Sequence, residues 1–297
     1  MANLKEVRTR IASVSSTQQI TSAMKMVSAA KLKKAQNDVA KVRPFEAKLA
    51  QIMGMLGSSV ADVSLNYPAY RVSSKGKVLL IAIASDKGLA GALNANVVKE
   101  VESLSTGEYA AEASRGELEV LAIGKQVAKG LRSRHVEVPT TEVADFYDDF
   151  TSQKVYDVAD SVASRFASKE YRKVVLVYNE FVNAAVQNVR DVQLLPLSLE
   201  TESAESEQTA FKDFIIEPNK EEVLADLIPQ AIRLRMLSVV RESLASEHGA
   251  RMTSMHKATD NATELLGELQ LQYNKARQTA ITNELIEIVS GASALNG

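Results

Sequence analysis

The chain has 297 residues, of which 35 are basic and 37 are acidic, and the net charge of −2 argues against a general nucleic-acid-binding protein. It contains no cysteine, which excludes disulfides, thiol catalysis and cysteine-ligated metals. Hydrophobic residues make up 45% of the chain and aromatic residues only 5%, a composition that favours long helices with aliphatic cores. No run of about 18 apolar residues could span a bilayer, so we expect membrane contact only through partners.

Residues 4–60 predict one long helix. Their apolar residues follow one another in steps of three and four, which is the spacing of a coiled-coil stripe. The stripe consists of Leu4, Val7, Ile11 and Val14, followed after a polar interval by Leu32, Val39, Val42, Leu49, Met53, Leu56, Val60 and Val63. Turn-forming residues between Asn66 and Lys77 then mark a boundary. We therefore assign residues 1–65 to an N-terminal coiled-coil helix.

Between Val7 and Asn37 every charged side chain of this helix is basic. These side chains are Arg8, Arg10, Lys25, Lys31, Lys33 and Lys34. A helix face that is simply solvated normally mixes both signs in i,i+4 pairs, so a helix of one sign is expected to bind an acidic partner. Nucleic acid fits less well, because the segment has no interleaved aromatic residues on which bases could stack. Salt-sensitive DNA binding that persists in a purified complex would favour that alternative.

The middle of the chain changes to short apolar runs separated by helical stretches. The runs lie at residues 77–84, 118–124 and 172–178, and residues 186–197 predict a further strand that ends at Pro196. Because the first three are almost continuously apolar, we expect strands covered on both faces, which is typical of a parallel α/β sheet. The polar residues 198–208 are interpreted as a linker or surface loop. We assign residues 66–209 to a Rossmann-like α/β domain.

From about residue 210 to Gly291 the sequence again predicts a helix, with possible breaks at Pro218 and Pro229. Two apolar stripes follow this helix in steps of three and four. The first consists of Leu224, Leu227, Ala231 and Leu234 and continues as Leu266, Leu269, Tyr273, Ala276 and Ala280; the second, displaced by one residue, consists of Ile281, Leu285, Ile288, Ala292 and Leu295. A helix this long needs a long partner, and the N-terminal helix is the simplest one. The predicted fold class is α/β: a long antiparallel coiled coil of the N- and C-terminal helices, residues 1–65 and 210–297, with the α/β domain inserted between them.

One motif hints at nucleotide binding. Gly88 and Gly91 follow a predicted strand and precede a predicted helix, as in a phosphate-binding turn. The third glycine of the dinucleotide pattern and the Gly-Lys-Ser/Thr of a P-loop are both missing. A nucleotide-binding α/β domain carried on a coiled-coil scaffold therefore stays as an alternative, and calorimetric titration with ATP would test it.

Other candidate chemical groups are weaker still. His135, His248 and His256 lack the spacing of a metal site. The acidic run at residues 141–150 is expected to cap and solvate the next helix rather than to form a catalytic carboxylate pair. We expect no catalytic residue, no cofactor and no metal site.

Four segments of the sequence resemble the gamma-subunit family of the F-type, proton-translocating ATP synthases. They are TQQITSAMKMVSAAKLKKAQ (17–36), SDKGLAGALN (85–94), YNEFVNAAVQNVRDVQLLPL (178–197) and the long stretch 246–295. The resemblance implies a central-stalk rotor that couples proton-driven rotation of a membrane ring to conformational cycling of the catalytic beta subunits, with no active site of its own. It implies the alpha and beta subunits of the catalytic hexamer, the epsilon subunit and the membrane c-ring as partners, and no nucleic acid.

The resemblance also implies which residues bind the beta subunits. Those expected next to the acidic lever of a beta subunit are Met24, Lys25, Lys31, Lys33 and Lys34. Those expected at the beta catch region are Arg251, Arg277, Gln278 and Thr282, with Glu284 and Glu287 alongside. The final residues 290–297 suit a smooth bearing at the top of the hexamer, or else a frayed terminus.

The location of the protein follows from the same resemblance. Because the sequence shows no transit peptide, we expect a peripheral membrane protein on the cytoplasmic side of a bacterial inner membrane. The loops at residues 106–117 and 200–208 look lineage-specific and receive no role.

Overall fold

The computed structural model describes residues 4–59, 67–134, 136, 138–143, 146–148, 150–197 and 216–295. The chain divides into two compact units. One unit consists of Met1–Ser28 together with Arg251–Gly297, and the other consists of Ala29–Ala250. The elements are α1 (Leu4–Ser59), η1 (Pro68–Tyr70), β1 (Lys77–Ile83), α3 (Leu93–Thr106), α4 (Ala110–Ser114), β2 (Leu118–Ile123), α5 (Lys125–Ser133), β3 (Thr140–Val143), α6 (Ser152–Ala167), β4 (Tyr171–Phe181), β5 (Gln187–Leu195) and α8 (Lys220–Leu295).

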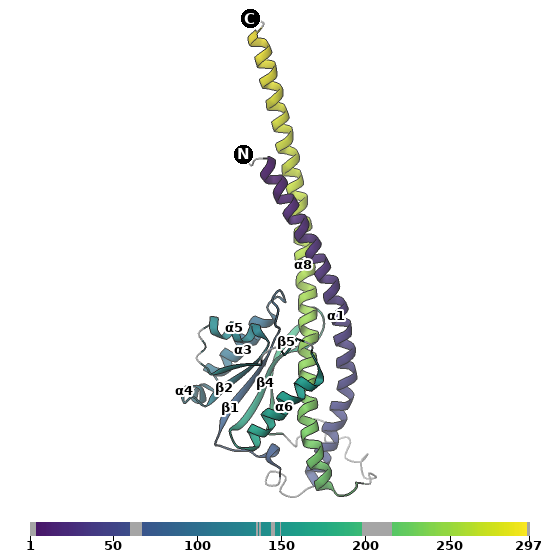
Figure 1. Cartoon of the computed structure of the whole chain (residues 1–297), viewed down its shortest axis with the longest axis vertical. Coiled ribbons are helices and arrows are strands. Elements are labelled where there is room, and N and C mark those ends of the chain that lie inside the picture. Colours follow the sequence, from purple (N-terminus) through teal and green to yellow (C-terminus); the bar gives the residue numbers. More distant parts are fainter. Residues whose placement is uncertain are drawn as a thin grey trace. The chain divides into compact units, whose positions relative to one another are not determined.

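Five strands form one sheet in the order β3-β2-β1-β4-β5 (Figure 1). Strands β1 to β4 are parallel to one another, whereas β5 pairs with β4 in the antiparallel direction and places Asp191 opposite Val177. The three predicted apolar runs correspond to β1, β2 and β4, and the further predicted strand corresponds to β5, so the predicted α/β sheet is confirmed.

Strand β3 lies outside the predicted runs. Its four residues are two threonines, a glutamate and a valine, and they are largely exposed at the edge of the sheet. Such a strand has no apolar face from which it could be recognised. Strand β3 includes the first residues of the acidic run at residues 141–150. The residue that caps α6 lies just after this run: it is Thr151, whose side chain accepts a hydrogen bond from the backbone N–H of Lys154.

Alternate residues of the central strands point to opposite faces of the sheet, and the residues on each face are buried in a different apolar layer. On one face, Val78 and Leu80 of β1 pack with apolar residues of α3 and α5. On the other, Leu79 and Ile81 pack with α6 and with the parts of α1 and α8 that belong to the same unit. Because both faces are covered, the strands are almost continuously apolar, which is the property that revealed them in the sequence.

Each long helix is continuous. Helix α1 passes through Pro44 and α8 through Pro229 without interruption, so the possible break at Pro229 does not occur. The predicted start near residue 210 is wrong for the described residues 216–219, which are not helical. Helix α8 begins at Lys220 because the side chain of Asn219 accepts a hydrogen bond from the backbone N–H of Glu222 at 2.8 Å.

The predicted stripe supplies the buried apolar residues of α1, whereas on α8 most buried apolar residues, such as Ile228, Ile232 and Met236, lie outside the predicted stripe. The buried members of the predicted stripes are Val7, Leu32, Val39, Met53 and Leu56 on α1 and Leu224 and Leu269 on α8. The second stripe of α8 differs, because Ile281, Leu285 and Ile288 are exposed.

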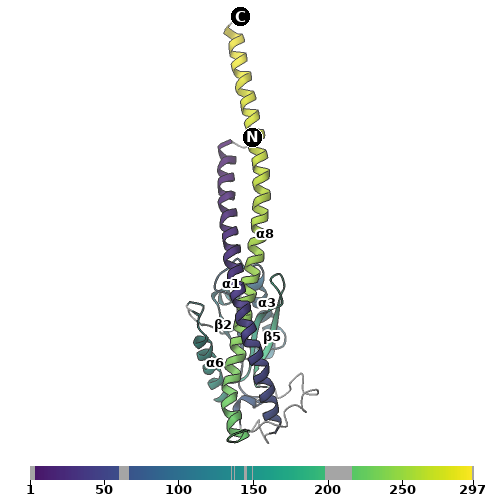
Figure 2. The ribbon, with the colours of Figure 1, turned by 90° about the vertical axis from the view of Figure 1, so that its right-hand side faces the viewer.

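The two helices pair antiparallel within each compact unit (Figure 2). In the first unit, the amide of Gln18 donates to the hydroxyl of Thr263 at 2.7 Å, and Thr21 and Thr259 share a hydroxyl hydrogen bond of 2.9 Å. Successive residues of α1 thus meet earlier residues of α8. The predicted antiparallel coiled coil is confirmed, and its hydrogen-bonded seam near Gln18 is polar, as the sequence suggested.

Some predictions fall outside the described residues. The domain boundaries at 65/66 and 209/210 and the loop at 198–208 all lie there. Among the described helices, none combines the length and apolar character needed to cross a membrane.

Candidate partner-binding surface

The basic residues of α1 lie on its outside. Lys31, Lys33 and Lys34 are exposed, and none of the ion pairs found among the described residues involves them. Their positive charge is therefore available to a partner. Met24 and Lys25, which belong to the other compact unit, are half-buried.

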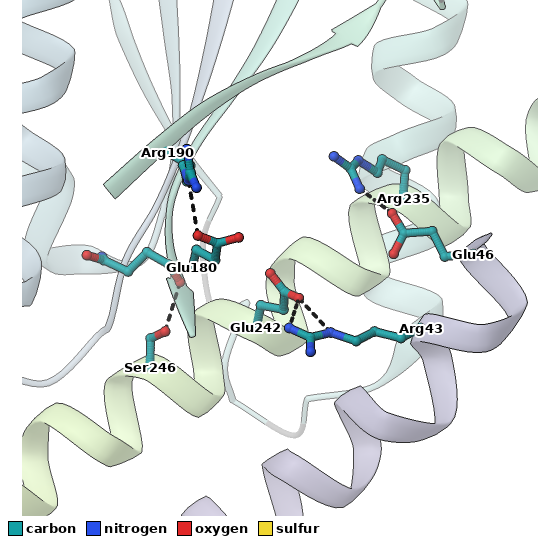
Figure 3. Close-up of polar contacts among 8 residues, drawn as sticks. Arg43, Glu46, Glu180, Arg190, Arg235, Glu242 and Ser246 are labelled. Carbon is teal, nitrogen blue, oxygen red and sulfur yellow. Dashed lines mark hydrogen bonds and ion pairs between the residues drawn. The ribbon is translucent and has the colours of Figure 1, made fainter. Parts of the chain in front are cut away.

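The acidic residues that follow on α1 are used within the chain. Asp38 pairs with Arg241 of α8 at 3.4 Å. Glu46 pairs with Arg235 of α8 (Figure 3). Burial would lower the pKa of Arg235, but its hydrogen bond to Glu46 and the charge of that carboxylate outweigh burial and raise it. Arg241 and Arg235 therefore neutralise Asp38 and Glu46, whereas none of the ion pairs found among the described residues involves Lys31, Lys33 or Lys34.

An aromatic residue beside these pairs stays neutral. Burial raises the pKa of Tyr178 to about 12, and the negative charge of Glu242 adds to the effect. Tyr178 therefore stays protonated across the physiological pH range.

The predicted catch residues on α8 are exposed with one exception. Arg277, Gln278, Thr282, Glu284 and Glu287 all lie on the surface of the chain. The hydroxyl of Thr282 donates a hydrogen bond to the backbone oxygen of Gln278 at 2.9 Å.

Arg251 is different, because its own chain encloses it and only 8% of its surface is exposed. It does not offer its guanidinium to a partner as openly as the other predicted residues do.

The last part of α8 carries many exposed apolar residues. These are Leu271, Ile281, Leu285, Ile286, Ile288 and Val289. Such a cluster is rare on a monomeric surface and indicates a protein interface. The predicted bearing segment 290–297 is helical as far as Leu295, and the side chains of residues 293–297 lie outside the described residues.

The loop with the glycine motif does not form an open phosphate site. The first backbone N–H of α5, that of Lys125, already donates to the carboxylate of Asp86 at 3.0 Å. This N–H belongs to the helix that follows β2, whereas the glycine motif precedes α3, so the contact bears on the motif only by fixing the negative charge of Asp86, which repels an anion such as phosphate. Ser85 is buried and bonded to the side chain of Asn94 at 2.9 Å.

The crevice of the sheet is also filled. In this strand order, ligands bind where the carboxyl ends of β1 and β4 diverge. Here α8 occupies that place: the hydroxyl of Ser246 donates to the backbone oxygen of Asn179 at 2.9 Å (Figure 3), and Ala250 packs on Ala90 and Leu93. These contacts argue against the alternative of a nucleotide-binding domain.

The histidines do not form a metal site in the described part of the chain. His256 lies 3.3 Å from Asp260 on the same helix, and His135 falls outside the described residues. No group of three or more potential metal ligands occurs among the residues that the structure describes.

Sequence reasoning missed two features of this surface. Leu89, in the glycine motif, is 64% exposed with a left-handed backbone (φ 63°), and Val182 and Val186 are exposed near the β4–β5 turn. Only the tertiary structure reveals their exposure, because the residue type alone does not say whether an apolar side chain is buried. The ion pair between Arg43 and Glu242 was equally invisible, since its partners are far apart in sequence.

Comparisons with known proteins agree with one another. Residues 3–295 match the family model described as ATP synthase. The ATP synthase gamma chain of Flavobacterium johnsoniae is 50% identical and that of Christiangramia forsetii 45% identical, each over 100% of both chains.

Solved structures show the same similarity. The central stalk/c-ring structure of the Tetrahymena thermophila mitochondrial ATP synthase contains a chain with a TM-score of 0.58 and 25% identity, covering 80% of this chain and 99% of that one. A chain of the Euglena gracilis mitochondrial ATP synthase structure (OSCP/F1/c-ring, rotational state 3) has a TM-score of 0.66 and 18% identity, covering 98% of this chain and 94% of that one, and supports the fold.

Proposed function

The chain belongs to the gamma-chain family of the ATP synthases, and we propose that it is the rotor shaft of a proton-translocating ATP synthase. In this role it couples rotation of a membrane ring to conformational cycling of catalytic beta subunits. The observation that carries the proposal is the antiparallel pairing of the two terminal helices in a chain whose relatives at full length are gamma chains.

The proposed mechanism is mechanical. A shaft whose faces differ presents a different surface to each of three chemically identical beta subunits. Each beta subunit then experiences a different interaction energy at a given angle, and rotation exchanges these energies. Driving one site from mostly open to mostly closed needs about 5 kcal/mol of differential binding. Several ion pairs and apolar contacts together supply that amount, so single contacts are dispensable.

The proposed contacts fall into two groups. The lysines Lys31, Lys33 and Lys34, with Met24 and Lys25, bind the acidic lever of a beta subunit. The exposed residues of α8, namely Arg277, Gln278, Thr282, Glu284 and Glu287, bind the catch region. Because Arg251 is enclosed by its own chain, we propose that it acts by supporting α8 rather than by direct contact.

Catalysis then belongs to the beta subunits, and the chain itself needs no catalytic residue, cofactor or metal. The α/β domain binds the epsilon subunit and the c-ring. Membrane contact occurs only through these partners, on the cytoplasmic side of a bacterial inner membrane.

Affinity purification from native membranes tests the proposal. A tagged copy of the full chain should bring down alpha, beta and epsilon subunits and the ring in fixed stoichiometry, while a tag-only control should bring down none of them. Absence of alpha and beta subunits would overturn the proposal. Tight stoichiometric binding of ATP to the isolated chain in calorimetry would do the same, in favour of the scaffold alternative.

A further inference from the structure

One turn of α1 lacks a backbone hydrogen bond of the helix. Pro44 has no N–H and cannot donate to the backbone oxygen of Ala40, four residues earlier, and its ring crowds that oxygen. The helix nevertheless continues from Leu4 to Ser59. Proline inside a helix is a common cause of a bend, so the backbone of α1 bends easily at this turn, called here the proline turn.

The apolar packing of α1 is also thin around the proline turn. Val39 and Met53 are buried, but no residue of α1 between them is. The apolar stripe advances from Val42 to Leu49 in steps of four and three, and the residue at the intermediate position is Glu46. Burial of apolar side chains therefore contributes little to holding this part of the helix in place.

The proline turn lies between two differently anchored parts of α1. After the turn, four residues pack in the apolar core that α1 shares with α6, α8 and the sheet, namely Leu49, Ile52, Met53 and Leu56. Among its described residues, that core includes no residue of α1 before Leu49, and Val39 is buried outside it. Residues 40–48, called here the hinge segment, are therefore the part of α1 that can open locally while its flanks stay packed.

Two ion pairs to α8 lie on either side of Pro44. Arg43, directly before it, donates to the carboxylate of Glu242 at 3.1 and 2.7 Å (Figure 3). Glu46, two residues after it, accepts a hydrogen bond from Arg235 (Figure 3). Only 11% of the Glu242 side chain and 18% of the Glu46 side chain are exposed. Breaking these two pairs, called here the clasp, leaves enclosed charges without partners, which costs more than breaking exposed pairs.

We propose that the proline turn is a hinge of α1 and that the clasp holds this hinge closed against α8. The charge pairs hold α1 in place of the backbone bond and the apolar contacts that it lacks here. When the clasp is broken, the hinge segment opens locally. The inference concerns contacts within one chain and does not rest on the proposed function. In a rotor shaft, such a hinge would set how stiffly α1 follows the α/β domain.

Hydrogen exchange followed by mass spectrometry on the full chain tests the role of the clasp. Arg43→Gln combined with Arg235→Gln removes both cations, and we expect the amides of residues 45–48 to exchange about tenfold faster. Exchange in β1 should stay unchanged. The matched control is Arg233→Gln, which removes the ion pair of α8 with Asp160 on α6 and should leave exchange in the hinge segment within about twofold.

The dependence on proline tests the hinge itself. Pro44→Ala restores the missing donor, so the same pair of glutamine substitutions in that background should accelerate exchange by no more than about threefold. Equal acceleration in the two backgrounds would overturn the hinge, because the clasp would then act without regard to the proline. An acceleration in β1 as large as that in the hinge segment would also overturn it, since the whole unit would be loosened.

Salt gives a readout that needs no substitution. Raising the salt concentration from about 0.05 M to about 1 M screens the ion pairs and should accelerate exchange of the hinge segment about threefold in the wild type. The variant without both arginines should show no such response, and an equal response would overturn the clasp. If purification brought down no alpha or beta subunits, the proposed function would be rejected, whereas these exchange rates would still decide on the hinge.

Discussion

Arg43 donates two hydrogen bonds to the same carboxylate oxygen of Glu242, from Nε at 3.1 Å and from a terminal guanidinium nitrogen at 2.7 Å (Figure 3). The pair joins α1 to α8 within the Ala29–Ala250 unit. Its two members are unequally exposed, since 55% of the Arg43 side chain but only 11% of the Glu242 side chain is open to solvent.

This inequality predicts an asymmetric response to mutation. Arg43→Ala leaves a largely buried carboxylate without its donor and should lower the free energy of unfolding by about 2 kcal/mol. Glu242→Ala leaves an arginine that water can solvate and should cost about 1 kcal/mol or less. Urea unfolding of the full chain, with both single variants and the double variant, measures the two costs. Equal costs would show that burial of the carboxylate does not matter.

Two glycines of α8 should respond differently to the same change. Gly267 has open space around it, so Gly267→Ala should raise the free energy of unfolding by about 0.5 to 1 kcal/mol through helix propensity. At Gly249 a new Cβ would lie 3.3 Å from Cα of Ala184 and 3.4 Å from the ring of Phe181. In Gly249→Ala this crowding offsets the gain in helix propensity, and Gly249→Leu should be clearly destabilising because its side chain is larger.

Urea unfolding of the two alanine variants and of Gly249→Leu beside Gly267→Leu checks this difference. If leucine is tolerated equally at both positions, the close approach of α8 to the β4–β5 turn is not a constraint.

Gly124 joins β2 to α5 and should not accept a side chain. Its φ is +102°, and a Cβ would lie 2.3 Å from the backbone oxygen of Ala84. Gly116 also has a positive φ, of +71°, but no atom lies within 4 Å of the position that an added Cβ would take. Gly116→Ala should therefore cost about 1 kcal/mol from backbone strain, and Gly124→Ala about 3 kcal/mol or more because the backbone must also move.

Unfolding experiments on the full chain, or the soluble yield where unfolding cannot be followed, compare these two variants. A similar loss of stability in both variants would mean that the positive φ alone causes the destabilisation and that the contact with the backbone oxygen of Ala84 does not add to it.

Charge reversal tests the proposed mechanism. Replacing Lys31, Lys33 and Lys34 together by Glu should weaken the coupling between ATP hydrolysis and proton pumping while the complex still assembles, because the partner surface is expected to be acidic. The ratio of pumping to hydrolysis in membrane vesicles is the measurement, and a single Lys33→Glu variant should change it little. Unchanged coupling in the triple variant would contradict charge pairing.

Acid stability should depend on Glu119. Burial alone would raise the pKa of this carboxyl, but hydrogen bonds from Lys77 and Tyr171 and the charges of Lys77 and Arg165 outweigh burial and lower it. A carboxyl whose pKa is lower in the folded than in the unfolded chain stabilises the fold above the unfolded value, near 4.3. This stabilisation is lost as the pH falls through the folded value.

The free energy of unfolding should therefore decline more steeply between about pH 5 and pH 3 in the wild type than in Glu119→Gln. Urea midpoints across that range provide the measurement, with Glu268→Gln, an exposed acid on α8, as the matched control. Parallel pH profiles for wild type and Glu119→Gln would contradict the prediction.

The sequence by itself determined the fold class, the two long helices and the strands β1, β2, β4 and β5. The three-and-four spacing from Leu4 to Leu56 and the apolar runs of β1, β2 and β4 are local patterns, and each is imposed by burial of one helix face or of both strand faces. The start of α8 at Lys220, where the side chain of Asn219 caps the helix, was not predicted. Strand β3 escaped because an exposed edge strand need not carry an apolar pattern.

Only the tertiary structure decided which charges remain available. The sequence presents Asp38 and Glu46 as acids among the bases of α1, yet Arg241 and Arg235 neutralise them from a helix far along the chain. In the same way, Ser246 and Ala250 fill the crevice that the glycine motif left open as a nucleotide site. Which distant segments pair depends on how their surfaces pack in the folded chain. A local sequence pattern does not contain that information.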